Sequence, residues 1–310
     1  MSYKPFTFRL TYRFGAIHIG TAKFRAIEPE EHPFELPPHP DFDQYPLEAF
    51  EKGVEAVILS SHPIQKPLER LSMQRGVLCY VPVTYNRHYI DLSGSFQEYL
   101  DKSSHKKRYN LRREVRKLTE EGAEFQVFRS AEELSRFYPL AREVSRKTWH
   151  ESLLRRGLPD TPEFKASMRA HGERDTARGF LLFKGGIPIA YQYAMMEKGV
   201  LMLMNLGYDP EFRDASPGTV LQYLALESLF AEKKFTIFDF EEGDSQYKQT
   251  FATESLECAD VFLFAPTLRA KTLIRAHLAL NALVRAVLAG TERAGLKVRL
   301  KRLLKARAVK

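Results

Sequence analysis

A short loop between an apolar strand and a helix, near residue 216, most constrains what this chain can fold into. The apolar run that ends at Tyr208 is followed by a polar loop, and Ser216-Pro217-Gly218 then opens a helix with apolar residues at the helical period. Ser216 suits an N-cap and Pro217 suits the first helical position. Because the first amides of a helix lack partners and the dipole is positive there, the loop predicts an anion site. On these three residues alone, an ordinary helix start is favoured.

Length and composition set the outer bounds. A chain of 310 residues, with 44% hydrophobic and 28% charged residues, can bury a sizeable core and is long enough for two domains. Cys79 and Cys258 lie too far apart for metal-ligand spacing or a disulfide framework, so no metal is expected. The first ten residues lack the apolar core of a signal peptide, which makes the cytoplasm the expected compartment.

The net charge of +8 is concentrated in two stretches. Residues 102–117 carry eight Lys/Arg and one acid, and residues 269–310 carry twelve Lys/Arg and one acid. The rest of the chain holds 27 basic against 37 acidic residues and is therefore acidic. Local basic charge attracts polyanions, anionic lipid or phosphorylated ligands, whereas a solvated helical face is the simpler interpretation.

The first basic stretch lies on a predicted helix. Ser103 or Ser104 can cap this helix, which runs to Glu121 and stops at Gly122. Apolar residues form one stripe along it and basic residues occupy the remaining faces. It either joins two domains as a solvent-facing helix or presents side chains such as Arg112 and Arg113 to phosphates.

The order of elements is clearest from residue 125 onward. Strand-like and helix-like patterns, with a capping box at Ser130 and Glu133 and a tight turn at Gly185-Gly186, give the series β-α-α-β-β-β-α-β-α-β. Before it, residues 6–27 form strand-like runs, and residues 28–46 contain six prolines and predict a loop.

This series resembles the GNAT-fold acyltransferases, in which an [Arg/Gln]-x-x-Gly-x-[Gly/Ala] loop after the fourth strand holds the pyrophosphate of coenzyme A. Residues 213–218 match that loop, with Ser216 in place of the first glycine, and Pro217 offers no amide to a phosphate. With the later pattern of Asp239, Gly243, Tyr247 and Lys248, the chain is similar to the BioF2-like or CelD-like branch, related to the FemAB peptidyltransferases. The resemblance covers about residues 88–264.

The resemblance implies an α/β fold with a GNAT-like mixed sheet flanked by helices. By analogy with FemAB proteins, residues 1–89 are expected to form a second, degenerate GNAT-like lobe beside the acyltransferase domain of residues 90–265, whose residues 90–122 carry the linking basic helix. Residues 266–310 are expected to form a helical basic tail. In that tail, residues 273–288 are too short and interrupted for a membrane span and are expected to pack on the body.

The implied chemistry needs a base for the acceptor, a donor for the oxyanion and an acid for the leaving group. GNAT enzymes often hold a tyrosine acid after the fifth strand, so the resemblance gives Tyr247 that role. Asp239 and Lys248 join it as catalytic candidates, and Glu241 is hardly favoured. The donor-binding candidates are Leu206, Tyr208, Arg213, Ser216, Gly218 and Thr219, and the substrate-binding candidates are Gln192, Asn205, Glu242, Arg112 and Arg113.

The expected function is transfer of an acyl group from acyl-CoA, such as acetyl-CoA, or a related carrier to an amine or hydroxyl acceptor. One alternative is a FemAB-type transferase that uses aminoacyl-tRNA, and another is a non-catalytic protein that kept the scaffold. Acyl carrier protein and tRNA are the candidate macromolecular partners. The basic end, residues 297–310, suits packing, RNA or peripheral contact with an anionic membrane.

Overall fold

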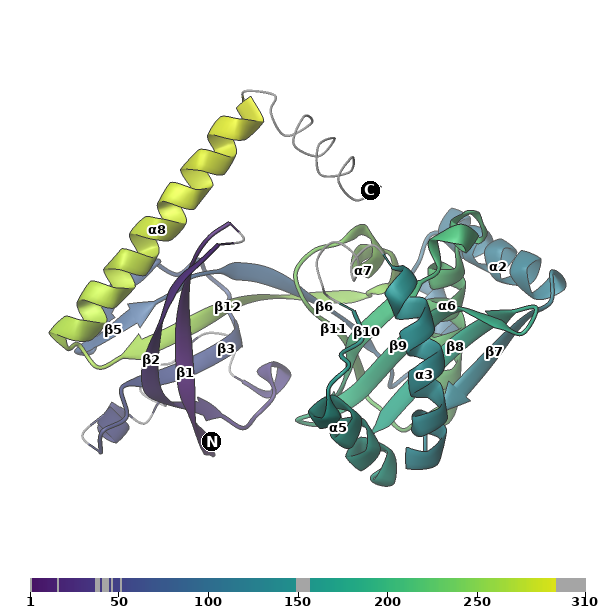
Figure 1. The fold of residues 1–310 in the computed structure, drawn as a ribbon, viewed down its shortest axis with the longest axis horizontal. Coiled ribbons are helices and arrows are strands. Elements are labelled where there is room, and N and C mark those ends of the chain that lie inside the picture. The colour runs from purple at the N-terminus through teal and green to yellow at the C-terminus, as the bar shows by residue number, and fades with distance from the viewer. Residues whose placement is uncertain are drawn as a thin grey trace. The chain divides into compact units, whose positions relative to one another are not determined.

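The chain divides into two compact units in the computed structural model, which describes residues 2–15, 17–36, 40, 45, 47–50, 52–148 and 157–293 (Figure 1). Unit 1 takes residues 1–85 and 256–310, and unit 2 takes residues 86–255. These boundaries differ from the expected ones, because late elements of the chain share a hydrophobic core with the N-terminal strands. Phe264 and Ile274 belong to the same buried cluster as Leu10 and Phe24.

Unit 1 is built mainly of strands. Strands β1 and β2 form an antiparallel hairpin, β2 pairs in parallel with β3, and β12 pairs with both β3 and β5. The elements are β1 (Tyr3–Phe14), β2 (Ile17–Pro29), β3 (Ala56–Pro63), β4 (Leu71–Gln74), β5 (Val77–Tyr80), β12 (Glu254–Phe264) and α8 (Leu268–Arg293), with short 3-10 turns at Pro33–Glu35 and Leu47–Phe50. Helix α8 packs on the strands of unit 1 through Ala270 and Ile274. Residues 297–310 lie outside the described residues.

Unit 2 is a mixed sheet with helices on both faces. Its strand order is β6-β11-β10-β9-β8-β7, and all neighbours are antiparallel except β10 and β11. The strands are β6 (Thr84–Asp91), β7 (Ala123–Phe128), β8 (Ala177–Lys184), β9 (Ile187–Glu197), β10 (Val200–Tyr208) and β11 (Ile237–Glu242). Strand β9 reads as a nearly continuous apolar run because both of its faces are covered.

The helices of unit 2 enclose two separate cores. Helices α1 (Phe96–Asp101), α2 (His105–Glu120) and α6 (Pro217–Glu232) contribute to one buried cluster, and α3 (Ala131–Lys147) and α5 (Pro162–Glu173) contribute to the other. The short helix α7 (Gln246–Phe251) follows β11. The predicted series from residue 125 is confirmed as β7, α3, α5, β8, β9, β10, α6, β11, α7 and β12.

The predicted helix caps are mostly found. Ser104 caps α2 by accepting a hydrogen bond from the Lys107 amide at 3.3 Å, and Ser130 forms the expected capping box with Glu133. No helix formed by the described residues combines the length and apolar character needed to cross a bilayer.

Candidate active site

The two parallel strands at the centre of unit 2 separate toward their carboxyl ends. Strand β10 pairs with β11 only at Leu201↔Phe238 and Met202↔Asp239. Beyond these pairs the register of β10 with β9 shifts between Leu203 and Asn205, and β11 has its own irregularity between Asp239 and Glu242. Such bulges bend strands and redirect side chains. The separated ends leave backbone groups of β10 without a partner strand on the β11 side, at the edge where α/β proteins bind ligands.

One side of this opening is charged. Asp239 is fully buried, and its Oδ2 accepts a hydrogen bond from Arg87 Nε at 2.7 Å, while its Oδ1 accepts one from the Glu241 amide at 2.9 Å. Burial raises the pKa of the Asp239 carboxyl, and the Arg87 guanidinium opposes this by favouring the charged form. Because both of its oxygens already accept hydrogen bonds, Asp239 stabilises the bulge and is poorly placed to take a proton from a substrate.

Glu241, which follows this pair, has the properties of a general base. Its backbone lies in the left-handed region with φ of +60°, and its side chain is half-buried. Burial, reinforced by the nearby Asp239 charge, raises the pKa of the Glu241 carboxyl to about 7. A base with this pKa is well matched to neutral pH. Sequence reasoning gave Glu241 little weight, because its backbone conformation and burial are set by the bulge.

Lys248 completes the charged side from helix α7. Its Nζ donates hydrogen bonds to the carbonyl oxygens of Glu241 at 3.1 Å and Glu242 at 2.5 Å. Burial lowers the pKa of the Lys248 ammonium. Lys248 therefore fixes the turn that presents Glu241, while the Glu242 side chain is exposed.

The other side of the opening is polar but uncharged. Gln192 of β9 and Gln222 of α6 are buried, and Gln192 Nε2 donates to Gln222 Oε1 at 3.0 Å. The same oxygen accepts a short hydrogen bond from the Tyr247 hydroxyl. Burial raises the pKa of the Tyr247 phenol far above neutral, so the hydroxyl keeps its proton. Among the described residues, the buried Gln222 Nε2 has no hydrogen-bond partner.

The structure therefore divides the three predicted catalytic residues between two clusters. Asp239 and Lys248 meet around the Glu241 turn, and Tyr247 joins Gln192 through Gln222. Within the described residues, no hydrogen bond or ion pair connects Tyr247 to the charged side. Gln222 was missed by sequence reasoning, although a glutamine in an otherwise apolar helix stretch was a usable signal.

The loop before α6 differs from the expected cap. Ser216 occupies the N-cap position, but its side chain makes no capping hydrogen bond, and its backbone is left-handed at φ 50°, ψ 44°. Glycine adopts this conformation most readily, which explains why the GNAT loop has glycine at the position that Ser216 occupies here. The Ser216 carbonyl accepts bonds from the Thr219 and Val220 amides, so the Thr219 amide is occupied, and no acceptor among the described residues is found for the Gly218 amide.

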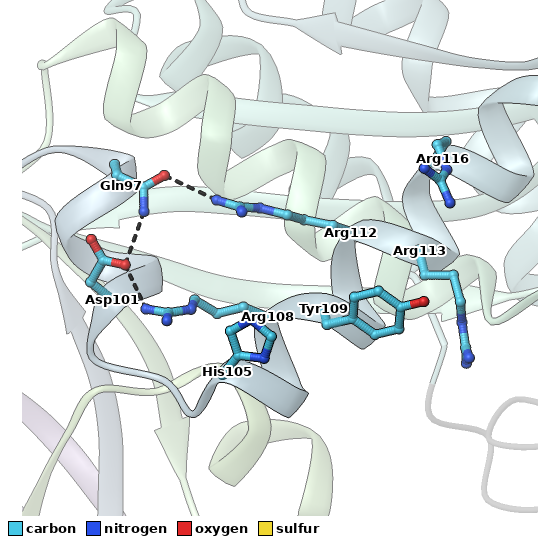
Figure 2. Close-up of a pocket in the computed structure, with 8 residues that line it drawn as sticks. All are labelled: Gln97, Asp101, His105, Arg108, Tyr109, Arg112, Arg113 and Arg116. Carbon is cyan, nitrogen blue, oxygen red and sulfur yellow. Dashed lines mark hydrogen bonds and ion pairs between the residues drawn. The ribbon is translucent and has the colours of Figure 1, made fainter.

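Two cavities border the basic helix α2. One, of about 230 Å³, lies between α2 and the loop before α6 and is lined by Arg113, Glu114, Lys117, Leu118, Glu121, Asp214, Ala215 and Ser216. The other, of about 390 Å³, lies between α1 and α2 and is lined by Gln97, Asp101, His105, Arg108, Tyr109, Arg112, Arg113 and Arg116 (Figure 2). Arg113 borders both cavities and so links them.

The arginines of these cavities are not equivalent. Arg112 donates to Gln97 Oε1 at 3.0 Å, and Arg108 pairs with Asp101 at 2.5 Å. Figure 2 shows Arg113 pointing away from both pairs, and within the described residues it has no ion pair. Of the two predicted arginines, Arg113 is therefore the one whose guanidinium is open to an anionic ligand.

The remaining predicted binding residues, Asn205 for the substrate and Leu206, Tyr208 and Arg213 for the donor, lie along and after the separated end of β10. Asn205 is half-buried, whereas the side chains of Leu206 and Tyr208 are 43% and 38% exposed. Tyr208 also lies against the helix start, since a Cβ placed on Gly218 would be 3.4 Å from its ring. Arg213 lies on the 3-10 turn Pro210–Ala215. In the part of the chain that is described, no three His, Cys, Asp or Glu side chains are grouped as metal ligands.

Comparison with known proteins agrees with this geometry. Residues 105–249 match the family model of the acetyltransferase (GNAT) domain, which supports acyl transfer as the general reaction. No curated protein matches the chain. The C-terminal domain of a putative lysylphosphatidylglycerol synthetase from Agrobacterium fabrum is similar, with 13% identity, a TM-score of 0.52 and coverage of 90% of this chain and 88% of that chain.

A second solved structure, FemX, is similar over 87% of this chain and 90% of that chain, with 11% identity and a TM-score of 0.50. At these identities the likeness concerns the fold alone. Together with the GNAT match, the two structures support a GNAT-like fold.

Proposed function

We propose that the protein transfers an acyl group from acyl-CoA or a related anionic carrier to an amine or hydroxyl acceptor. The observation that carries this proposal is the opening between β10 and β11, which has a carboxylate of near-neutral pKa on one side and a protonated phenol on the other. Acyl transfer needs both groups, and their environments keep them in opposite protonation states at neutral pH.

In the proposed mechanism, Glu241 takes the proton from the acceptor as it attacks the acyl carbonyl. A backbone amide of β10 beyond Met202, which faces no partner strand on the β11 side, stabilises the oxyanion. Tyr247 then gives its proton to the departing thiolate or hydroxyl, and Gln222 orients the phenol for that transfer. Asp239, Arg87 and Lys248 hold the charged side in shape without touching the reacting atoms.

The donor is held by its phosphates in this proposal. Arg113, whose guanidinium is open, lines the cavity beside Ser216, and the Gly218 amide and the positive end of α6 follow Ser216 in the chain. Because Pro217 supplies no amide, Arg113 and Lys117 are expected to provide the contacts that a longer run of loop amides would give. Within this scheme, membership of the BioF2-like or CelD-like branch stays a prediction.

A second candidate is an aminoacyl-tRNA-dependent transfer, and the pair of cavities linked by Arg113 favours it. From His105 to Lys117 the basic face of α2 covers thirteen residues, which spans about 18 Å at the rise of an α-helix. A ligand with several phosphates would use both cavities, whereas one that carries a single pyrophosphate group would fill the smaller cavity alone.

The test is a thermal-shift titration with coenzyme A, acetyl-CoA, acyl carrier protein and tRNA in parallel, since a ligand that binds the folded state raises the melting temperature. Turnover is then measured with the ligand that binds. Arg113→Gln should weaken donor binding strongly, and Arg112→Gln, whose side chain is engaged by Gln97, serves as the matched control. If none of these donors raises the melting temperature, or if the wild-type protein binds a donor without turnover, the protein is better described as a non-catalytic scaffold.

A further inference from the structure

The N-terminal hairpin of unit 1 carries positive charge without internal compensation. Residues 2–27 contain five Lys/Arg and no Asp or Glu. Strands β1 and β2 place Arg9 directly opposite Lys23, and Arg25 opposite Thr7, so three cations gather on neighbouring positions of one face. Like charges directly across an antiparallel pair are destabilising. Such an arrangement is costly for the isolated hairpin and is relieved when an anionic surface covers it.

The few carboxylates near this face do not neutralise it. Glu55 lies 3.9 Å from Arg25 and also accepts a hydrogen bond from Arg269 of α8 at 2.7 Å, so one acid serves two cations. Within the described residues, Arg9, Arg13 and Lys23 have no ion-pair partner. The side chains of all three are exposed.

Exposed apolar side chains lie at the turn end of the hairpin, near Arg13. Ile17 is 66% exposed and Ile19 is 58% exposed, which makes them two of the most exposed large apolar residues described. Positions 19, 21, 23 and 25 are all exposed and alternate with more buried ones, which brings Ile19, at the bulge opposite Tyr12 and Arg13, to the edge of the face of Lys23 and Arg25. Ile17 pairs with Phe14 beside the turn and lies at the tip of the hairpin. The face and the tip next to it therefore offer aliphatic side chains beside cations.

We propose that this hairpin, through the cations Arg9, Arg13, Lys23 and Arg25 of one face and the exposed Ile17 and Ile19 beside its turn, docks on an anionic lipid bilayer. Each basic side chain near such a surface is attracted to the acidic headgroups, and aliphatic side chains gain by entering the boundary of the acyl chains. A nucleic acid would neutralise the cations, but the isoleucines would gain little from contact with it, because bases are bound mainly by aromatic side chains and arginine. Pairing of β1 with a second copy of the chain is disfavoured by the cations along this edge strand.

The test is co-sedimentation of the full chain with vesicles of phosphatidylcholine alone and of phosphatidylcholine with phosphatidylglycerol. Binding is expected only to the anionic vesicles and should weaken as salt is raised. Ile17→Ser with Ile19→Ser should lower vesicle affinity about tenfold. Arg9→Gln, Arg13→Gln and Lys23→Gln together should lower it roughly a hundredfold at low salt, at roughly fivefold for each charge.

Matched controls separate this face from general surface effects. Ile187→Ser removes an exposed isoleucine beside another hairpin turn, and Lys66→Gln, Arg136→Gln and Arg174→Gln remove three exposed cations elsewhere. Both control sets should leave vesicle affinity unchanged, and thermal melting checks that every variant is folded. The proposal is overturned if wild-type protein ignores anionic vesicles, if both control sets lower affinity as much, or if RNA displaces the vesicles and the isoleucine variant binds them as wild type does.

Discussion

The two sides of the opening between β10 and β11 surround their proton-transfer groups differently: one side is charged and the other is neutral. On one side, burial raises the pKa of Glu241 to about 7; the Asp239 charge adds to this rise, and the charges of Arg87 and Lys248 oppose it. On the other side, Gln192 and Gln222 are neutral, and burial raises the pKa of the Tyr247 phenol, which is already protonated at neutral pH, further above its ordinary value. A charged shell tunes a proton affinity toward the working pH, whereas a neutral shell fixes one protonation state and orients the group.

The largest effects are expected from removing the two proton-transfer groups. Glu241→Gln and Tyr247→Phe should each lower turnover by about 10² to 10⁴-fold, the usual range for positioned proton transfer. Donor affinity should change little in both variants, because neither group contacts the phosphates. Single-turnover kinetics with the identified donor measures the chemical step apart from binding.

The same two variants should differ in pH dependence. Wild-type activity should rise with pH through a midpoint of about 7, because Glu241 acts when deprotonated, and this step should vanish in Glu241→Gln and persist in Tyr247→Phe. The contribution of Glu241 to folding stability changes with pH in the opposite direction to activity. Since the folded pKa of Glu241 is above its ordinary value of 4.5, its contribution to stability is present below that value and is lost as pH rises to about 7. A wild-type rate in Tyr247→Phe would remove the phenol from the mechanism.

The next largest effect concerns folding on the charged side. Arg87→Met leaves the buried Asp239 carboxylate without its cation and should lower the free energy of unfolding by about 3 to 5 kcal/mol. Replacing both partners, as in Arg87→Met with Asp239→Leu, should recover much of that loss, because apolar substitutes of similar size are often tolerated. Urea unfolding of the two single variants and the double variant measures the coupling.

A smaller effect is expected on the neutral side. Gln222→Leu removes the acceptor of Tyr247 and the partner of Gln192, and leaving these buried groups unsatisfied should cost about 1 to 3 kcal/mol. Turnover should also fall, but by less than in Tyr247→Phe, because the phenol is still present and has lost only its orientation. If stability falls while turnover stays at the wild-type value, Gln222 has a structural role only.

The smallest effect on turnover is expected from Lys248→Met. Its Nζ binds two carbonyl oxygens, so the loss in stability should be about 0.5 to 1.5 kcal/mol for each bond removed. The Lys248 charge holds the pKa of Glu241 down, and its removal should therefore shift the activity midpoint to higher pH. A midpoint that moves down or stays fixed would show that Lys248 and Glu241 are not electrically coupled.

The sequence predicted the order of elements in unit 2 and several caps, because these depend on local periodicity and on residues such as Ser104 and Ser130. It did not predict how the acids at the end of β11 divide their roles. Asp239 became a buried ion-pair partner and Glu241 the candidate base, since a bulge and the distant Arg87 decide which carboxylate is engaged. Ser216 was expected to cap through its side chain, yet its role lies in its left-handed backbone.

Unit 1 has its last strand and its long helix encoded after the whole of unit 2. The cluster around Leu10 and Phe24 is closed by Phe264 and Ile274, which lie about 250 residues later in the chain. During synthesis, unit 2 can therefore complete its sheet before the strand that packs against the N-terminal hairpin has been made. The positive charge of the hairpin keeps it soluble at that stage, because cations on an exposed edge strand discourage pairing with other chains. The residues proposed to meet a membrane in the finished protein would thus protect the same segment while the protein is being made.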